Sequence, residues 1–372
     1  MKLNMFTLLF FCFSTISGLF AQEENTKQKD TLSLFLNYVE KLSNAFDEND
    51  QDFFINSFSK KTIDSIIPDN TDQKYVDVYR KAVKTGLKTF VAKLYMDMGN
   101  GSYYDFINYS RTEEENSYHA MFRLYNEDTG INYHQYRISL KDSTFIINDI
   151  FTLLDGDFLS ESLKTTLNNS YKRDSDKDAD LYKKFLVLKN MGLDSKAYSV
   201  AKKIKDTTFL NKIFLILKAQ AASEVSTNEY IKCLKDILKK YPSDPSLTLL
   251  SIDYYYLSND FNNLFRALEH LERYTNDDFI KYMVGNYAYE IEDFHLAQES
   301  YEYIVKNYPT FLSAELMLLH TYNKLNSNKE AIKVLDNLLQ NGYTKKQLIN
   351  FVKTDINDFY KTKDFKSWKR HH

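Results

Sequence analysis

The spacing of hydrophobic residues changes twice along the chain. It is helical at first: Thr31–Phe46 has apolar residues three and four positions apart, which predicts a helix with one buried face and Asp30 as its N-cap. The same spacing predicts a short helix over Asp52–Phe58 and a long one over Gln73–Met98. Because Gly99-Asn100-Gly101 tolerates a left-handed backbone, the long helix is expected to end there.

The period then falls to two, the spacing of a β-strand with one buried face. Turn-rich residues separate the alternating runs, as between the strands of a hairpin. The sequence therefore predicts a four-stranded antiparallel meander, with strands over Tyr103–Tyr109, Ser117–Leu124, Tyr133–Leu140 and Phe145–Leu154. Gly156 is expected to break the last strand, and Phe158–Leu167 to form a short closing helix.

This order of elements, helices first and a curved antiparallel sheet after them, is similar to the NTF2-like superfamily. The resemblance covers residues 30–167 and rests on element order, without a diagnostic motif. It implies helices packed on a cone-shaped sheet. Members of the superfamily include small isomerases and hydrolases as well as binding and dimerising domains, so the fold alone does not select a function.

After a polar, charged linker over residues 168–179, helical spacing continues nearly to the end. One equivalent position recurs at steps of 33, 34, 33 and 34 residues, at Ala197, Tyr230, Leu264, Ala297 and Ala331. Such a period is typical of stacked helical hairpins, here over residues 180–343. Residues 344–372 are expected to form a capping helix and tail, with Trp368, the only tryptophan, as a capping contact.

The segment Asp278–Pro309 shows the repeat most clearly. It resembles the tetratricopeptide (TPR) pattern of about 34 residues, with Gly285, Ala297, Tyr301 and Pro309 in the family's order of small, small, aromatic and proline. The two small residues are expected to let a pair of helices approach closely, Tyr301 to fill the gap between adjacent hairpins, and Pro309 to end the second helix. The next repeat keeps the family's aromatic and small residues, and the first three share the period only.

The TPR resemblance implies a groove lined by the first helix of each hairpin. Carried over position by position, it gives this lining: Leu249, Asp253, Tyr256, Phe279, Tyr282, Asn286, Tyr289, Glu290, Leu316, His320, Asn323 and Lys324. Tyrosine offers a rigid ring and a hydroxyl, which suits a bound peptide or helix. The alternative for each tyrosine is packing between hairpins. Some TPRs clamp a peptide carboxylate with lysine and asparagine, but Tyr282 replaces the lysine, so that clamp is not supported.

Residues 1–21 have the features of a secretory signal: a positive start, an apolar stretch and a small residue at Ala21 before a charged run. A retained membrane anchor is the alternative, although polar residues interrupt the stretch. Cys12 lacks the small residues that precede a lipidated cysteine. No later segment is long and apolar enough to span a membrane. The protein is therefore expected to be exported, to the periplasm or outside the cell.

The composition limits the classes of partner and cofactor that the protein is expected to bind. A net charge of −3 gives no basic field for nucleic acid. Cys233 would be the lone cysteine after cleavage, so no internal disulfide is expected, and its apolar helical surroundings favour a buried structural role. The sequence has no metal-ligand spacing, phosphate-binding glycine loop or nucleophile motif, and it predicts neither a metal nor a cofactor.

Catalysis in the N-terminal cone is the alternative to binding. The candidates are His134, Asp149 and His119, with Tyr109 and Arg123 as polar neighbours. His119 and Arg123 share a face that suggests solvent, whereas His134 lies on an apolar face. An active site would require His134 and Asp149 to meet in one pocket. The sequence therefore favours an exported, non-enzymatic scaffold that binds a protein or peptide, with ligand binding or catalysis in the cone as the alternative: an α+β domain, then an all-α TPR-like solenoid.

Overall fold

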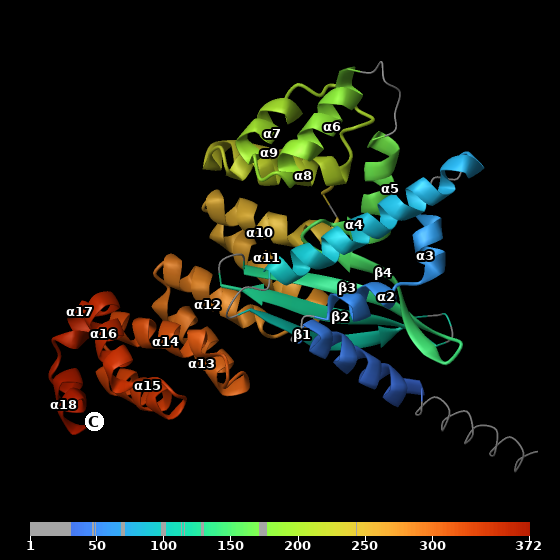
Figure 1. Cartoon of the computed structure of the whole chain (residues 1–372). Helices are drawn as coiled ribbons and strands as arrows, with labels where there is room; N and C mark the ends of the chain where they lie inside the picture. Colours follow the sequence, from blue (N-terminus) through green and yellow to red (C-terminus); the bar gives the residue numbers. More distant parts are fainter. Residues whose placement is uncertain are drawn as a thin grey trace, which may run out of the picture. The chain divides into compact units, whose positions relative to one another are not determined.

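The computed structural model describes residues 31–372 except 47, 49, 68–70, 98–101, 113, 115, 128–129, 171–176 and 243. It divides into two compact units, Met1–Ser258 and Asn259–His372, each considered by itself here. The predicted signal segment, the N-cap at Asp30 and the helix stop at 99–101 lie outside the described residues. Figure 1 labels the helices and strands.

The first unit contains one antiparallel sheet in the order β1-β2-β3-β4-β5 (Figure 1). Its strands are β1 (Tyr103–Arg111), β2 (Ser117–Asn126), β3 (Gly130–Lys141), β4 (Thr144–Thr152) and β5 (Asp157–Phe158). The predicted four-stranded meander is confirmed. The prediction missed β5, which pairs Phe158 with Phe151. Two residues are too few to show a period, and the turn before them depends on Gly156.

Helices cover one face of the sheet. They are residues 31–46, α2 (Gln51–Asn56), α3 (Lys60–Ser65), the 3-10 turn η1 (Gln73–Tyr75), α4 (Val76–Asp97) and α5 (Leu159–Ser170). Alternate residues of the strands, such as Phe122, Tyr136 and Ile147, form a core with Phe35 and Leu87 from these helices. The sequence did not predict α3, because its six residues offer too short a run for a helical period.

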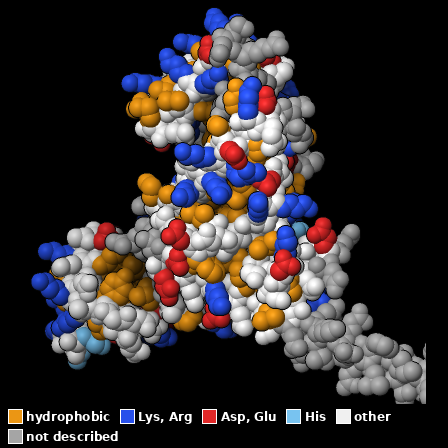
Figure 2. Space-filling view, turned by 45° about the vertical axis from the view of Figure 1, so that its right-hand side comes forward, with side chains coloured by type: hydrophobic (Ala, Val, Ile, Leu, Met, Phe, Trp, Pro, Cys, Tyr) orange, Lys and Arg blue, Asp and Glu red, His pale blue; other side chains and the backbone are white. Residues whose placement is uncertain are grey.

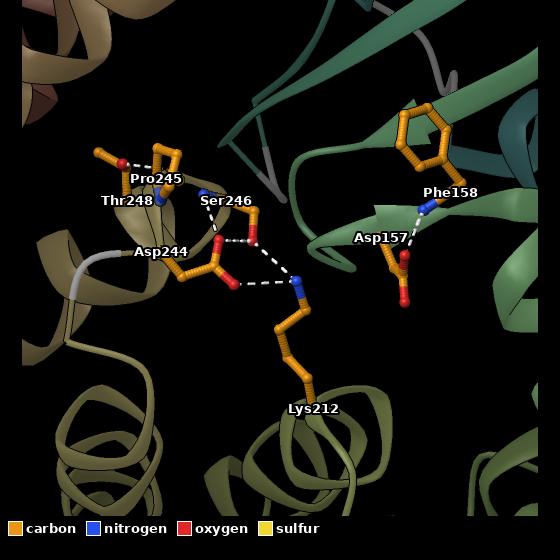
Figure 3. A network of polar contacts seen from close by, with 7 residues as sticks. All are labelled: Asp157, Phe158, Lys212, Asp244, Pro245, Ser246 and Thr248. Atoms are coloured by element: carbon orange, nitrogen blue, oxygen red, sulfur yellow. Dashed lines mark hydrogen bonds and ion pairs between the residues drawn. The ribbon is translucent and has the colours of Figure 1, made fainter.

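The turn at Gly156 packs against the helical part of the same unit. Gly156 has φ +65°, and a Cβ there would lie 3.1 Å from Ser246 Oγ and 3.2 Å from Ile216 Cδ1. Beside this contact, Lys212 Nζ donates to Asp244 Oδ2 at 3.0 Å and to Ser246 Oγ at 3.2 Å (Figure 3). Only glycine fits this backbone conformation and this spacing without strain. The sheet and this part of the helical region therefore share one packed joint.

All described residues after α5 that form regular structure are helical. The first unit continues with α6 (Lys177–Asn190), α7 (Asp194–Ala201), α8 (Lys212–Ser223), α9 (Thr227–Lys240), η2 (Pro245–Leu247) and α10 (Thr248–Leu257). The second contains α11 (Phe261–Thr275), α12 (Ile280–Glu290), α13 (Phe294–Asn307), α14 (Leu312–Lys324), α15 (Asn328–Gln340), α16 (Lys345–Asp355), α17 (Asn357–Tyr360) and α18 (Lys363–His371). Within the second unit, each of α11 to α14 packs against the next helix, and α18 packs against α15.

The hairpin of α12 and α13 is built around a close approach. A Cβ on Gly285 would lie 2.7 Å from the ring of Tyr301, and the Tyr301 hydroxyl donates to Asn286 Oδ1 at 2.8 Å. Ala297 is fully buried, and α13 ends two residues before Pro309, as predicted. Tyr301 thus fills the space inside its own hairpin, and the predicted place between adjacent hairpins is wrong.

Two single-residue expectations concern burial. Cys233 is a buried free thiol whose Sγ lies 3.9 Å from the Tyr198 hydroxyl, and burial raises the pKa of the thiol. Trp368 is buried, stacks on Phe365, and donates from Nε1 to Asp336 Oδ1 at 2.7 Å. Both residues therefore have the structural roles expected of them. Across the described residues, no helix combines the length and apolarity needed to cross a bilayer.

Candidate functional site

A buried polar network lies in the core beneath the sheet. His134 is 2% exposed, and its Nδ1 lies 2.9 Å from the Tyr104 hydroxyl. That hydroxyl lies 2.6 Å from the hydroxyl of Tyr136. On the other side of the ring, His134 Nε2 lies 3.1 Å from Asn132 Nδ2. Both ring nitrogens therefore have partners within the protein.

The hydrogen bonds of Asn132 fix the tautomer of His134. Asn132 Oδ1 accepts from the backbone N–H groups of Tyr133 at 2.8 Å and Leu154 at 3.0 Å, so the amide NH₂ faces His134. Nε2 must then accept, and Nδ1 carries the proton that it donates to Tyr104. Burial lowers the pKa of His134 to about 3, so the ring stays neutral near pH 7. With a pKa so far below the operating pH, His134 is a weak base and poorly suited to general-base catalysis.

His134 and Asp149 do not meet, so the condition that an active site built on these two residues requires is not fulfilled. Asp149 lies directly opposite Arg137 in the β3–β4 ladder. Because side chains alternate along a strand, Arg137 and Asp149 point to the face opposite that of His134. Asp149 instead accepts from the backbone N–H groups of Ile150 at 2.9 Å and Ser160 at 3.2 Å. It therefore holds the start of α5, a structural role.

The other candidates of this domain are separated as well. His119 is half-buried opposite Arg137, and burial, followed by the charge of Arg137, lowers the pKa of His119. Arg123, expected in solvent, is only 4% exposed and pairs with Asp105 at 2.7 Å. Tyr109 is partly exposed, with its ring against Phe35 and Tyr118. These residues form no shared catalytic cluster.

The predicted groove residues of the first unit lie on α10. Leu249 is buried, and Asp253 accepts a hydrogen bond from the Tyr230 hydroxyl at 2.6 Å. Burial raises the pKa of Asp253, against that hydrogen bond. Tyr256 is half-buried. Asp253 thus has a partner on α9, and its carboxylate joins two helices.

Two of the predicted groove residues in the second unit are part of its core. Phe279 and Tyr282 are buried, and both rings lie edge-on against Phe311, at 4.9 and 4.8 Å. Asn286 accepts the hydroxyl hydrogen bond of Tyr301. The alternative of packing between hairpins therefore describes Phe279 and Tyr282.

Three other rings form a row across the alternate helices α12, α14 and α16. The ring of His320 on α14 lies 6.4 Å from Tyr289 on α12 and 5.3 Å from Phe351 on α16, edge-on to each. All three side chains are half-buried. We call Tyr289, His320 and Phe351 the ring row. Its members combine a predicted histidine and tyrosine with Phe351, which was predicted only as part of the capping helix.

The repeat pattern did not indicate Phe351. The steps from Tyr289 to His320 and from His320 to Phe351 are 31 residues each, shorter than the repeat of 33 or 34 residues, so the three rings do not occupy equivalent positions of the repeat. In the pattern His320 corresponds to Asn286, and no repeat is predicted after residue 343. The ring row is therefore a contact that only the packing of the helices reveals.

Charged and polar groups border the ring row. Glu290 and Lys324 are exposed, and Leu316 and Asn323 are half-buried on the same helices. Lys324 Nζ lies 5.8 Å from the ring centre of Phe294. Burial lowers the pKa of His320, an effect that Asp355 opposes and Lys324 reinforces. Burial raises the pKa of Tyr289, as does Glu290. The surface is aromatic at its centre and bears both charges at its edge.

Charges of both signs are also interspersed with hydrophobic patches on the face of the molecule drawn in Figure 2. The described residues contain no group of three or more His, Cys, Asp or Glu able to hold a metal ion. In comparisons with known proteins, no family model matches the chain and no curated protein matches it.

Proposed function

We propose that the protein is an exported, non-enzymatic scaffold, with an NTF2-like N-terminal domain and TPR-like hairpins that bind a protein or peptide. The single observation that carries the proposal is the ring row. Three half-buried rings on the alternate helices α12, α14 and α16 offer one contact surface to another molecule. Rigid aromatic side chains lose little entropy when a partner covers them, which is why they dominate binding surfaces.

The border of the ring row indicates the kind of partner. The exposed Glu290 near Tyr289 and the exposed Lys324 near His320 give a surface of mixed charge. Such a surface suits an extended peptide or an amphipathic helix that places apolar side chains on the rings and polar ones at the edge. A nucleic acid would need a continuous basic surface, and the net charge of −3 does not favour one.

The test replaces rings that are half-buried and so keep surface that a partner can contact. Tyr289→Ala with Phe351→Ala should abolish capture of the native partner from envelope extracts and leave the helical circular dichroism unchanged. Tyr282→Ala would be a poor choice, since Tyr282 packs on Phe311 and Tyr301. Tyr274→Ala is the matched control: this tyrosine is partly exposed on α11, outside the row. Equal recovery of the partner by the double variant and by the control would refute the ring row as the site.

The alternative function, ligand binding or catalysis in the N-terminal domain, is supported by one cavity. It has a volume of about 500 Å³ and lies between the helix of residues 31–46 and β1, where Leu36, Glu40 and Tyr104 line it. Tyr104 joins it to the buried His134 network. Native mass spectrometry of the protein purified from its source should show a retained small molecule if this cavity is a ligand site. Leu36→Trp, which fills the cavity, should then release it.

A further inference from the structure

The second unit has a cleft that contains a buried carboxylate. The cleft, of about 290 Å³, lies between α13 and α15, with α14 beneath them. Glu315, in the first turn of α14, is only 4% exposed. Its Oε1 accepts a weak hydrogen bond from Asn341 at 3.3 Å, whereas its Oε2 is buried without a hydrogen-bond partner.

This arrangement is costly unless something else binds there. A buried oxygen without a partner loses its hydration and gains nothing in return, which costs more for a charged group than for a neutral one. Burial raises the pKa of Glu315, and neutralisation would reduce the penalty. Neutralisation would not remove it, because the protonated oxygen would then be a donor without an acceptor. A cation entering the cleft would satisfy the carboxylate.

The apolar walls of the cleft indicate which kind of cation would bind there. Val305, Leu318 and Val334 contribute apolar surface from three different helices, above the carboxylate. Arginine and lysine have a chain of methylene groups behind the charged end, and such side chains bury the chain while the charge seeks a polar partner. A bare metal ion would gain nothing from apolar walls. The described residues also hold no group of three acidic, histidine or cysteine ligands.

The protein's own lysines do not fill this role. Lys306 and Lys333 line the cleft but are exposed, and neither forms an ion pair with Glu315 among the described residues. The nearby Glu302 already accepts hydrogen bonds from Tyr322 and Gln298, both at 2.7 Å. Glu330 also lines the cleft, but it is only half-buried, so hydration reaches its carboxylate. Glu315 is therefore the buried carboxylate that a partner's cation would satisfy.

From these observations we infer that the cleft of α13, α14 and α15 binds an arginine or lysine side chain of a protein partner, with Glu315 as its counter-ion. This site is distinct from the ring row. Glu315 and Leu318 lie on the side of α14 opposite His320, because successive helical residues turn by a fixed angle. A partner seated on one surface leaves the other open.

The test uses short blocked peptides as probes and methyl NMR of the purified protein as the readout. Acetyl-Gly-Arg-Gly-amide and its lysine counterpart should cause saturable shifts of the Val305, Leu318 and Val334 methyl signals. The citrulline peptide has nearly the shape of the arginine peptide but no charge, and it should cause none. Glu315→Gln should weaken arginine-peptide binding by about tenfold, since only the charge of the acceptor changes. Glu299→Gln, on an exposed position of α13, is the matched control and should bind as the parent does.

Val305→Phe guards against a folding defect in Glu315→Gln, because it blocks the cleft and leaves the carboxylate in place. It too should reduce peptide binding, with an unchanged circular dichroism spectrum. Three results would overturn the inference: equal shifts with the citrulline peptide, undiminished binding by both Glu315→Gln and Val305→Phe, or shifts caused by spermidine but by neither peptide. The last result would assign the cleft to a free polyamine. None of these outcomes depends on the ring row.

Discussion

Two histidines, each among aromatic rings, show how differently the two parts of the molecule use the same residue types. His134 is buried in the sheet domain, with Tyr104 and Asn132 on its two nitrogens. His320 lies between Tyr289 and Phe351, half-buried on the helical unit. The first arrangement is complete without another molecule. The second leaves ring surface that a partner can cover.

The difference teaches how to judge a histidine seen only in sequence. His134 alternates with Tyr136 and Ile138 on the buried face of a strand, and that pattern indicates core. His320 stands on a helix of the predicted repeat, at a position that the TPR resemblance assigns to the groove, and its half-buried ring meets rings of two other helices. Four variants or conditions test whether this contrast holds, starting with the largest expected effect.

Acid should destabilise the sheet domain through His134. The pKa of His134 is about 3 in the folded protein and 6.5 ordinarily. Between these pH values His134 is therefore protonated in the unfolded chain and neutral in the folded one. Stability should therefore fall as pH drops from 6.5 toward 3, by on the order of 5 kcal/mol in total. Hydrogen exchange of β2 and β3 peptides at pH 7, 5.5 and 4.5 measures it. His134→Gln, which does not titrate, should lose this part of the slope, and a slope identical to that of the parent would contradict the assignment.

Removing the buried ring should cost nearly as much. His134→Ala leaves a cavity and takes the partner from the Tyr104 hydroxyl, so the free energy of unfolding should fall by about 3 kcal/mol. Faster exchange of amides in β3 would report it. A loss of unfolding free energy below about 1 kcal/mol would mean that the hydrogen-bond network contributes little to stability. The contrast with His320 would then disappear.

Crowding the hairpin under the ring row should have an intermediate effect. Gly285→Ala places a methyl group 2.7 Å from the Tyr301 ring and should destabilise the second unit by about 2 kcal/mol. Fluorescence of Trp368, the only tryptophan, during urea unfolding reports on this unit. A double-mutant cycle with Tyr301→Ala is the control, since removal of the ring should cancel the clash. Strict additivity would show that the strain lies elsewhere.

His320→Ala should have the smallest effect. Its ring is half-buried and rests on two other rings, so its loss should reduce the free energy of unfolding by about 1 kcal/mol or less. The same Trp368 transition measures it. A loss as large as that of His134→Ala would make His320 a core residue and would leave the ring row without a free surface.

Much of the fold was predictable because its signals are periodic. The four long strands and the helical C-terminal half each repeat a spacing over many residues. The structure adds what spacing does not contain. Strand β5 has two residues and exists because Gly156 turns the chain back. Burial of Arg123 depends on surroundings that strand alternation alone does not specify.

The candidate sites were less predictable, for a related reason. The TPR resemblance assigned Tyr289 and His320 to the groove, but it also assigned the buried Phe279 and Tyr282 to it. One face of a helix can be buried in one turn and accessible in the next, and the pattern does not distinguish the two. Glu315 gave no signal at all. A glutamate in the first turn of a helix is ordinarily a solvated residue that favours the helix dipole, and its burial arises only from the packing of α13 and α15 around α14.

The joint at Gly156 determines where the chain can be cut for experiment. A fragment that begins in the charged segment near residue 171 would lose the turn that covers Ile216 and Leu247. These apolar side chains would then be exposed to solvent. Such a fragment could aggregate or bind other proteins for reasons unrelated to its native partner. Division at Ser258–Asn259 keeps that joint whole. The two fragments that result are therefore better suited to testing which unit captures the partner.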